Sequence, residues 1–141
     1  MNNMIVLIDD WQMQCCGMPF KTGDYIEWTV VKKEEVNEVW DKFYPEPIEY
    51  YYENHADAQM KIPVLKGIVG NIYANFFRYE IELRRQHKFQ KYKEYFIPVE
   101  MKSIIVGEAD GWHNDMDTNV WKFGCYTVYL QNPILNCYES N

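Results

Sequence analysis

The chain has 141 residues, of which 48% are hydrophobic and 25% charged, and this composition indicates a single folded domain spanning residues 1–141. The net charge of −7 has the same sign as the charge of a phosphate backbone and is repelled by it, so we expect no nucleic-acid partner. No run approaches the roughly 20 apolar residues of a membrane span, and the start, MNNMIVLIDDW, lacks the basic segment of a signal peptide. We therefore expect a cytoplasmic protein with no membrane partner, whose cysteines are thiols or metal ligands.

The N-terminal part of the chain predicts two strands separated by a turn region. Met4–Ile8 is a short apolar run, which is typical of a buried strand. Asp9–Trp28, DDWQMQCCGMPFKTGDYIEW, is dense in cysteine, glycine and tryptophan and favours a structured hairpin. From Tyr25 to Val31 strand-forming residues alternate between two faces, so Gly23-Asp24 is expected to form a turn that leads into a strand.

The next segment predicts a short helix. Apolar residues of Glu34–Phe43, EEVNEVWDKF, recur at helical spacing, and the acids at its start suit the N-terminal end of a helix dipole. Pro45 is expected to stop this helix. Ile48–Glu53, IEYYYE, could then form a strand.

The second half of the chain predicts further strands. Val64–Tyr73 is one, and its glycines Gly67 and Gly70 indicate bulges or the close approach of a neighbouring strand. Phe76–Leu83 fits a strand or a helix, and the basic stretch Arg84–Lys93 is interpreted as a solvated face. The remaining predictions are strands at Phe96–Val106 and Trp121–Leu130, a loop at Ala109–Thr118 and a peripheral tail after Pro133.

Five or six strands and one short helix predict a mainly β fold, a β-rich α+β domain. Aromatic residues make up 17% of the chain and favour strands, in agreement with this class. The expected architecture is a small twisted sheet or an SH3-like partly open barrel, because a Gly-Asp turn feeds an alternating strand and KGIVGNI follows later.

The N-terminal residues also carry a resemblance. Trp11-Gln12, Cys15-Cys16-Gly17, Pro19-Phe20, Gly23-Asp24 and Trp28 resemble the signature Trp-Gln-x-x-Cys-Cys-Gly-x-Pro-Phe…Gly-Asp…Trp of a family of small uncharacterised bacterial proteins. The pattern continues into a histidine-containing loop around His55 and a strand at Lys66–Val69, and it covers about the first half of the chain. The resemblance implies a bacterial origin and a domain of unknown function, and it assigns no catalytic residue.

Zinc is a cofactor that the residue types suggest, with Cys15, Cys16 and His55 as candidate ligands and Cys125 as a fourth. The spacing argues against it, because zinc-ligating cysteines usually lie about two to four residues apart. A redox role is not favoured either, since adjacent cysteines are not a C-x-x-C motif and no basic residue flanks them. Without a metal, one cysteine would pack as a small apolar side chain.

Two histidines are candidates for acid–base chemistry. His55 lies two residues from Asp57, and His113 lies near Asp110, Asp115 and Asp117, so a carboxylate could orient either imidazole. However, no serine or cysteine stands in a nucleophile elbow, and no glycine-rich phosphate cradle follows a strand. We therefore favour structural or solvated histidines, and a hydrolytic enzyme that uses His55 or His113 remains an alternative.

A run of aromatic residues is the candidate partner-binding surface. Tyr50, Tyr51 and Tyr52 are consecutive, so at least one faces away from any core that the others enter. Together with Trp40 they would form an anchor patch if several are exposed, and core packing is the alternative.

Charge, size, aromatic content and the lack of catalytic motifs favour a non-enzymatic protein-binding module of inhibitory, immunity-like or regulatory type. An acidic protein of this kind suits a basic partner. A small metal- or ligand-binding β-barrel that uses Cys15, Cys16 and His55 is the second hypothesis.

Overall fold

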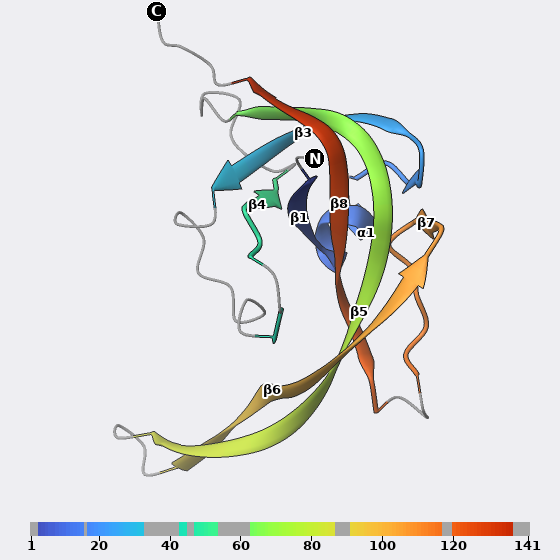
Figure 1. The fold of residues 1–141 in the computed structure, drawn as a ribbon. Coiled ribbons are helices and arrows are strands. Elements are labelled where there is room, and N and C mark those ends of the chain that lie inside the picture. Colours follow the sequence, from blue (N-terminus) through green and yellow to red (C-terminus); the bar gives the residue numbers. More distant parts are fainter. Residues whose placement is uncertain are drawn as a thin grey trace, which may run out of the picture.

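The computed structural model describes residues 3–15, 17–32, 43–44, 47–53, 63–86, 91–116 and 120–136 of the chain (Figure 1). Within these residues the elements are, in chain order, β1 (Asn3–Asp9), α1 (Asp10–Cys15), β2 (Phe20–Lys21), β3 (Tyr25–Lys32), β4 (Tyr50–Tyr52), β5 (Val64–Gln86), β6 (Lys91–Val106), β7 (Glu108–Ala109) and β8 (Lys122–Asn136).

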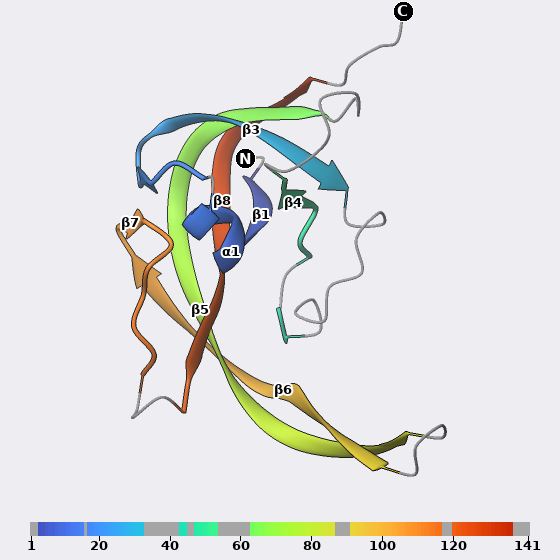
Figure 2. The same cartoon turned by 180° about the vertical axis from the view of Figure 1, so that it is seen from behind.

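Six of the strands form one mixed sheet in the order β3–β4–β1–β8–β5–β6. β1 and β4 run parallel, whereas the other neighbours in the sheet are antiparallel. β3 also pairs with β5, so the sheet curls round on itself as a partly open barrel, and β6 lies outside this curl (Figures 1 and 2). The predicted class, mainly β with a twisted sheet and one short helix, is confirmed.

In β1, apolar and polar residues do not alternate, because both faces of the strand are buried. Val6 and Ile8 enter one hydrophobic cluster, whereas Ile5 and Leu7 enter another on the opposite face of the sheet. Because both faces of the strand are covered, all four side chains are buried. The predicted strand at Met4–Ile8 is confirmed.

The two clusters lie on either side of the sheet. The first core fills the inside of the curl and includes Trp28, Leu65, Ile72, Tyr126 and Leu130. The second core covers the other face and includes Ile48, Tyr51, Phe77 and Cys125, with Phe43 and Tyr44 packed against it.

The predicted close approach at two glycines of β5 is confirmed. A Cβ atom at Gly70 would lie 2.9 Å from the carbonyl oxygen of Tyr129, and one at Gly67 would lie 3.1 Å from that of Gln131. The register between β5 and β8 shifts at both places. Glycine therefore lets β8 pack tightly against a strand that bends.

The predicted hairpin at Asp9–Trp28 is wrong. Asp10 begins the helix α1, where its carboxylate accepts a hydrogen bond from the backbone N–H of Trp11 at 2.8 Å. β2 then pairs with β7, more than 80 residues further along the chain, and not with β3. The strand predicted to follow the Gly23-Asp24 turn is confirmed, since β3 begins at Tyr25 and buries Ile26, Trp28 and Val30.

The other helix prediction, at Glu34–Phe43, falls on residues 34–42, outside the described residues. Ile48–Glu53 forms only the short strand β4. Among the residues that the structure describes, no helix is long and apolar enough to cross a membrane.

The second half forms longer strands than predicted. Phe76–Leu83 belongs to β5, which runs without a break from Val64 to Gln86. The tail after Pro133 is not peripheral up to Asn136, because it pairs with the start of β5 and so continues β8. Beyond Phe77, which pairs with Lys122, β6 is the only described strand that pairs with β5. This two-stranded extension, Tyr79–Gln86 and Lys91–Pro98, is called the arm and projects from the curled sheet (Figures 1 and 2).

Candidate functional site

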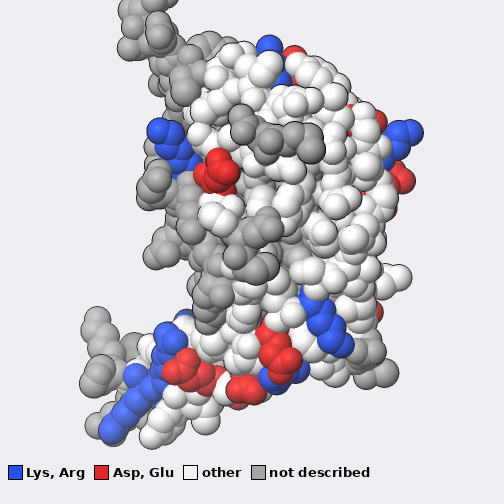
Figure 3. Space-filling view, viewed as in Figure 1, with Lys and Arg blue, Asp and Glu red and all other residues white. Residues whose placement is uncertain are grey.

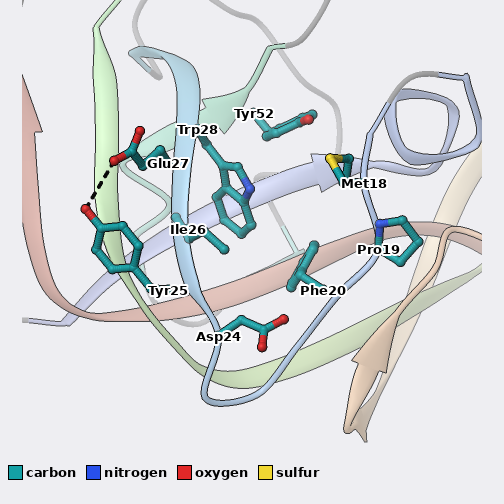
Figure 4. A pocket seen from close by; sticks show the side chains of 9 residues that line it. All are labelled: Met18, Pro19, Phe20, Asp24, Tyr25, Ile26, Glu27, Trp28 and Tyr52. Atoms are coloured by element: carbon teal, nitrogen blue, oxygen red, sulfur yellow. Dashed lines mark hydrogen bonds between the residues drawn. The ribbon is translucent and has the colours of Figure 1, made fainter.

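A pocket of about 460 Å³ opens beside the start of β3. It is lined by Met18–Phe20, by Asp24–Trp28 and by Tyr52 of β4 (Figure 4). Three separate segments thus meet at one site, and most of its lining belongs to the N-terminal region that dominates the sequence pattern.

The turn before β3 positions one wall of the pocket. Gly23 has a φ angle of 96°, a conformation that favours glycine, and a Cβ there would meet nothing within 4 Å. The carboxylate of Asp24 accepts a hydrogen bond from the N–H of Lys21 at 3.0 Å, which closes the turn. Gly23 donates to the carbonyl oxygen of Val69, and Val69 donates to that of Asp24, both at 2.8 Å, so the turn is fastened to β5.

Aromatic rings form the inner wall. Trp28 lies at the centre, with Phe20, Met18 and Tyr52 around it (Figure 4). The ring centroids of Phe20 and Trp28 are 4.9 Å apart and those of Trp28 and Tyr52 are 5.6 Å apart, both in edge-to-face geometry. Met18 is 82% exposed, so a flexible and polarisable side chain lies at the rim.

The rim also carries negative charge. Glu27 is exposed, and its carboxylate accepts a long hydrogen bond from the hydroxyl of Tyr25 at 3.4 Å (Figure 4). The Nζ atom of Lys66 lies 3.7 Å from the same oxygen. An exposed ion pair of this length contributes little, so Glu27 can exchange this contact for another cation.

Tyr52 stays neutral at physiological pH. Its partial burial raises the pKa of its phenol, and the negative charge of Glu53 adds to the effect. The ring therefore offers an apolar surface with a hydroxyl group. Aromatic rings beside carboxylates attract a cationic side chain whose apolar stem can pack against the rings.

The predicted aromatic patch is divided between different environments. Tyr51 is buried in the second core, while Tyr50 and Tyr52 are partly buried against the first. None of the three is left on an open face, because both faces of β4 are covered. Tyr52 nevertheless reaches the pocket, and Trp40 lies outside the described residues.

The predicted zinc ligands are not assembled in the described part of the chain. Cys15 takes part in a disulfide bond, so the expectation of a thiol there is wrong. Cys16 and His55 lie outside the described residues. Among the described residues, no group of three or more His, Cys, Asp or Glu side chains could hold a metal ion. A sulfur in a disulfide has no thiolate to offer a metal, so zinc at Cys15 would first require reduction.

His113 is packed among aromatic rings. Its ring centroid lies 5.1 Å from that of Phe123 and 5.4 Å from that of Tyr126, and its buried Nε2 atom has no hydrogen-bond partner among the described residues. The nearby Asp115 accepts hydrogen bonds from the backbone of Phe123 and from Lys122. Of the carboxylates that the sequence suggested for His113, Asp115 is therefore engaged with other groups, and Asp117 lies outside the described residues.

A buried polar network lies where β5, β6 and β8 meet. The amide of Asn75 donates to the hydroxyl of Thr127 at 3.1 Å and accepts from the hydroxyl of Ser103 at 2.6 Å. Its amide nitrogen also lies 3.7 Å from the sulfur of Cys125. Burial raises the pKa of the Cys125 thiol, so this cysteine is neutral and a poor nucleophile. The network holds the three strands together, and its thiol, Cys125, is not exposed to solvent.

The sequence prediction missed most of the pocket, including Phe20, Glu27 and Trp28. One signal was present, because the alternation of Tyr25 to Val31 placed Ile26 and Trp28 on one face. The pairing of β3 with β4, which brings Tyr52 to Trp28, has no local signature.

These observations define a class: a mainly β domain with a pocket walled by aromatic rings and rimmed by carboxylates. The chain belongs to a family of unknown function, DUF6578, whose model matches residues 2–132. The match confirms the predicted membership of an uncharacterised family and extends it well beyond the first half of the chain. Searches of curated proteins and of solved structures found no significant match. The likeness to SH3 barrels therefore stays a prediction.

Proposed function

We propose that the protein is a non-enzymatic protein-binding module with an inhibitory, immunity-like or regulatory effect on its partner. The pocket beside Trp28 receives a lysine or arginine side chain of that partner. One observation carries the proposal: the acidic residues Asp24 and Glu27 and the aromatic residues Phe20, Trp28 and Tyr52 line one pocket of about 460 Å³.

The chemistry of the lining favours a basic side chain over other ligands. The apolar stem of lysine or arginine can pack along Trp28 and Tyr52, while the negative charges of Asp24 and Glu27 in the wall of the pocket attract its cationic group. Met18 at the rim can adapt to the shape of the bound segment. The net charge of −7 would in addition steer a basic partner toward the protein.

Selection from a random peptide library displayed on phage tests this proposal, because it requires no choice of a partner protein. We expect enriched peptides to contain lysine or arginine. Glu27→Lys should weaken binding of a selected peptide by on the order of tenfold, because it reverses a charge at the rim. Glu49→Lys makes the same charge change at an exposed residue outside the pocket and should leave the affinity within about threefold.

Fluorescence anisotropy of labelled peptides provides the affinities. A library that yields no specific peptide, or peptides without basic residues, would contradict the proposal. Equal losses in the Glu27→Lys and Glu49→Lys variants would also contradict it, because long-range charge would then explain the binding.

A further inference from the structure

The arm has two faces of opposite character. Residues directly opposite in an antiparallel pair point to the same side of the ribbon, so the register assigns each side chain to a face. One face carries the pairs Ile81–Phe96, Leu83–Glu94 and Arg85–Tyr92. The other face carries the pairs Glu80–Ile97, Glu82–Tyr95, Arg84–Lys93 and Gln86–Lys91.

The first of these, the apolar face, is open to solvent. Ile81 and Leu83 are each 59% exposed, Phe96 is 65% exposed and Tyr92 is 67% exposed. Nearer the body the same side of the ribbon continues into Tyr79, which packs against the second core. The apolar face is therefore an uncovered extension of a surface that is buried at its base.

Several charged residues of the opposite face have partners within the arm. Arg84 forms an ion pair with Glu82 at 3.0 Å, and its guanidinium lies 4.6 Å from the ring centroid of Tyr95. The Nζ atom of Lys93 lies 5.3 Å from the same ring centroid, and the amide of Gln86 donates a hydrogen bond to the hydroxyl of Tyr95 at 3.4 Å. Lys and Arg gather at the end of the arm farthest from the body (Figure 3).

Two charged residues on the apolar face differ from these. Arg85 and Glu94 occupy diagonal positions across the two strands, and both are exposed. Among the residues that the structure describes, neither makes an ion pair or a side-chain hydrogen bond. A face with one unpaired positive charge, one unpaired negative charge and four apolar side chains is complementary to a copy of itself.

We infer that two copies of the chain associate through the apolar faces of their arms, with Arg85 of each copy against Glu94 of the other. A two-fold axis along the arm lays β5 of one copy over β6 of the second. Each Arg85 then lies over Tyr92 of the second copy and beside its Glu94. The apolar side chains between these charges become buried.

The size and stability of the arm agree with this arrangement. Four side chains that are more than half exposed, with two charged neighbours, offer on the order of 500 Å² per copy, and a stable interface needs about 800 Å² per partner. The estimate predicts a weak to moderate dimer. A two-stranded ribbon with both faces in water is at best marginally stable, so covering one face would also stabilise the arm.

Sedimentation velocity of the full chain over a wide concentration range tests the inference. We expect a concentration-dependent dimer of the wild type. Arg85→Glu should weaken it by at least about tenfold, because two like-charge contacts replace two attractive ones. The double variant Arg85→Glu with Glu94→Arg should restore the affinity to within about threefold.

Arg84→Glu is the matched control, because it makes the same charge change one residue away on the opposite face and should leave the dimer within about threefold of the wild type. Leu83→Asp, an exposed position, should also weaken the dimer, and circular dichroism checks that each variant is folded. A wild type that is monomeric at every concentration would overturn the inference and leave the face to a different protein. Equal effects of Arg84→Glu and Arg85→Glu, or no recovery in the double variant, would overturn it as well.

Discussion

The hydroxyl of Tyr44 lies 2.8 Å from the sulfur of Cys125, although the two residues are 81 positions apart in the chain. This contact connects the segment before β4 to the first part of β8. It closes the second core over a cysteine that has no exposed surface. Several properties of the protein that can be measured depend on such contacts between distant segments.

Cys125 should resist alkylation in the folded protein. Its side chain is fully buried and its pKa is raised by burial, so both access and thiolate formation are suppressed. After treatment with iodoacetamide at about pH 8, near the ordinary thiol pKa, peptide mass spectrometry should find Cys125 unmodified in native protein and modified in denaturant. Modification at similar rates in both conditions would contradict the burial of this side chain.

Tyr79 should make the protein less stable at high pH. Burial raises the pKa of Tyr79 to about 12, and the negative charge of Asp10 contributes. Because an unfolded tyrosine ionises near pH 10, the free energy of unfolding should fall as the pH rises from about 10 to 12. After allowance for partial exposure, this loss is about 1–2 kcal/mol.

Urea unfolding of the wild type and of Tyr79→Phe, at about pH 9 and about pH 11.5, measures this contribution, since phenylalanine cannot ionise. The variant should lose less stability between the two pH values than the wild type. Tyr25→Phe, at a residue that is 62% exposed, should behave as the wild type does. An equal alkaline loss in Tyr79→Phe and the wild type would show that other groups cause it.

Gly70→Ala should destabilise the fold, whereas Gly107→Ala should not. A Cβ at Gly70 would lie 2.9 Å from the backbone oxygen of Tyr129, so β5 and β8 would have to separate. A cost of about 1–3 kcal/mol is typical of such overpacking. At Gly107 a Cβ would meet nothing within 4 Å. Thermal unfolding measures both variants, which carry the same Gly→Ala change at two positions. Similar unfolding midpoints would contradict the close approach of β5 and β8.

Tyr126→Phe should also destabilise the fold through one hydrogen bond. The buried N–H of Gly111 donates to the hydroxyl of Tyr126 at 2.9 Å. Removal of the hydroxyl leaves that N–H without its partner, which costs about 1–3 kcal/mol. The free energy of unfolding in urea measures this loss, and Tyr25→Phe on the exposed side should change it by less than about 0.5 kcal/mol. A Tyr126→Phe variant as stable as the Tyr25→Phe variant would contradict the role of this hydrogen bond.

Local patterns predicted several strands because the cause of each pattern is itself local. The alternation of Ile26, Trp28 and Val30 follows from the pleat of a strand with one buried side. The need for glycine at Gly67 and Gly70 follows from the absence of a Cβ where strands approach closely. The aromatic content and the family signature pointed to the mainly β class and to an uncharacterised family in the same way.

Other features depend on pairings that no local pattern records. The hairpin prediction at Asp9–Trp28 failed because β2 finds its partner in β7, far along the chain. The adjacent cysteines were candidate zinc ligands, whereas Cys15 forms a disulfide bond. The pocket depends on the pairing of β3 with β4, which brings Tyr52 beside Trp28.

Hydrophobic periodicity, glycine placement and charge act over a few residues, so the amino-acid sequence alone predicts the fold class, the main strands and the acidic character of this protein. The pairing of the strands, the aromatic lining of the pocket and the uncovered face of the arm follow only from the three-dimensional fold. Those outcomes depend on contacts between residues distant in sequence, whose free energy is realised only when the whole sheet has formed.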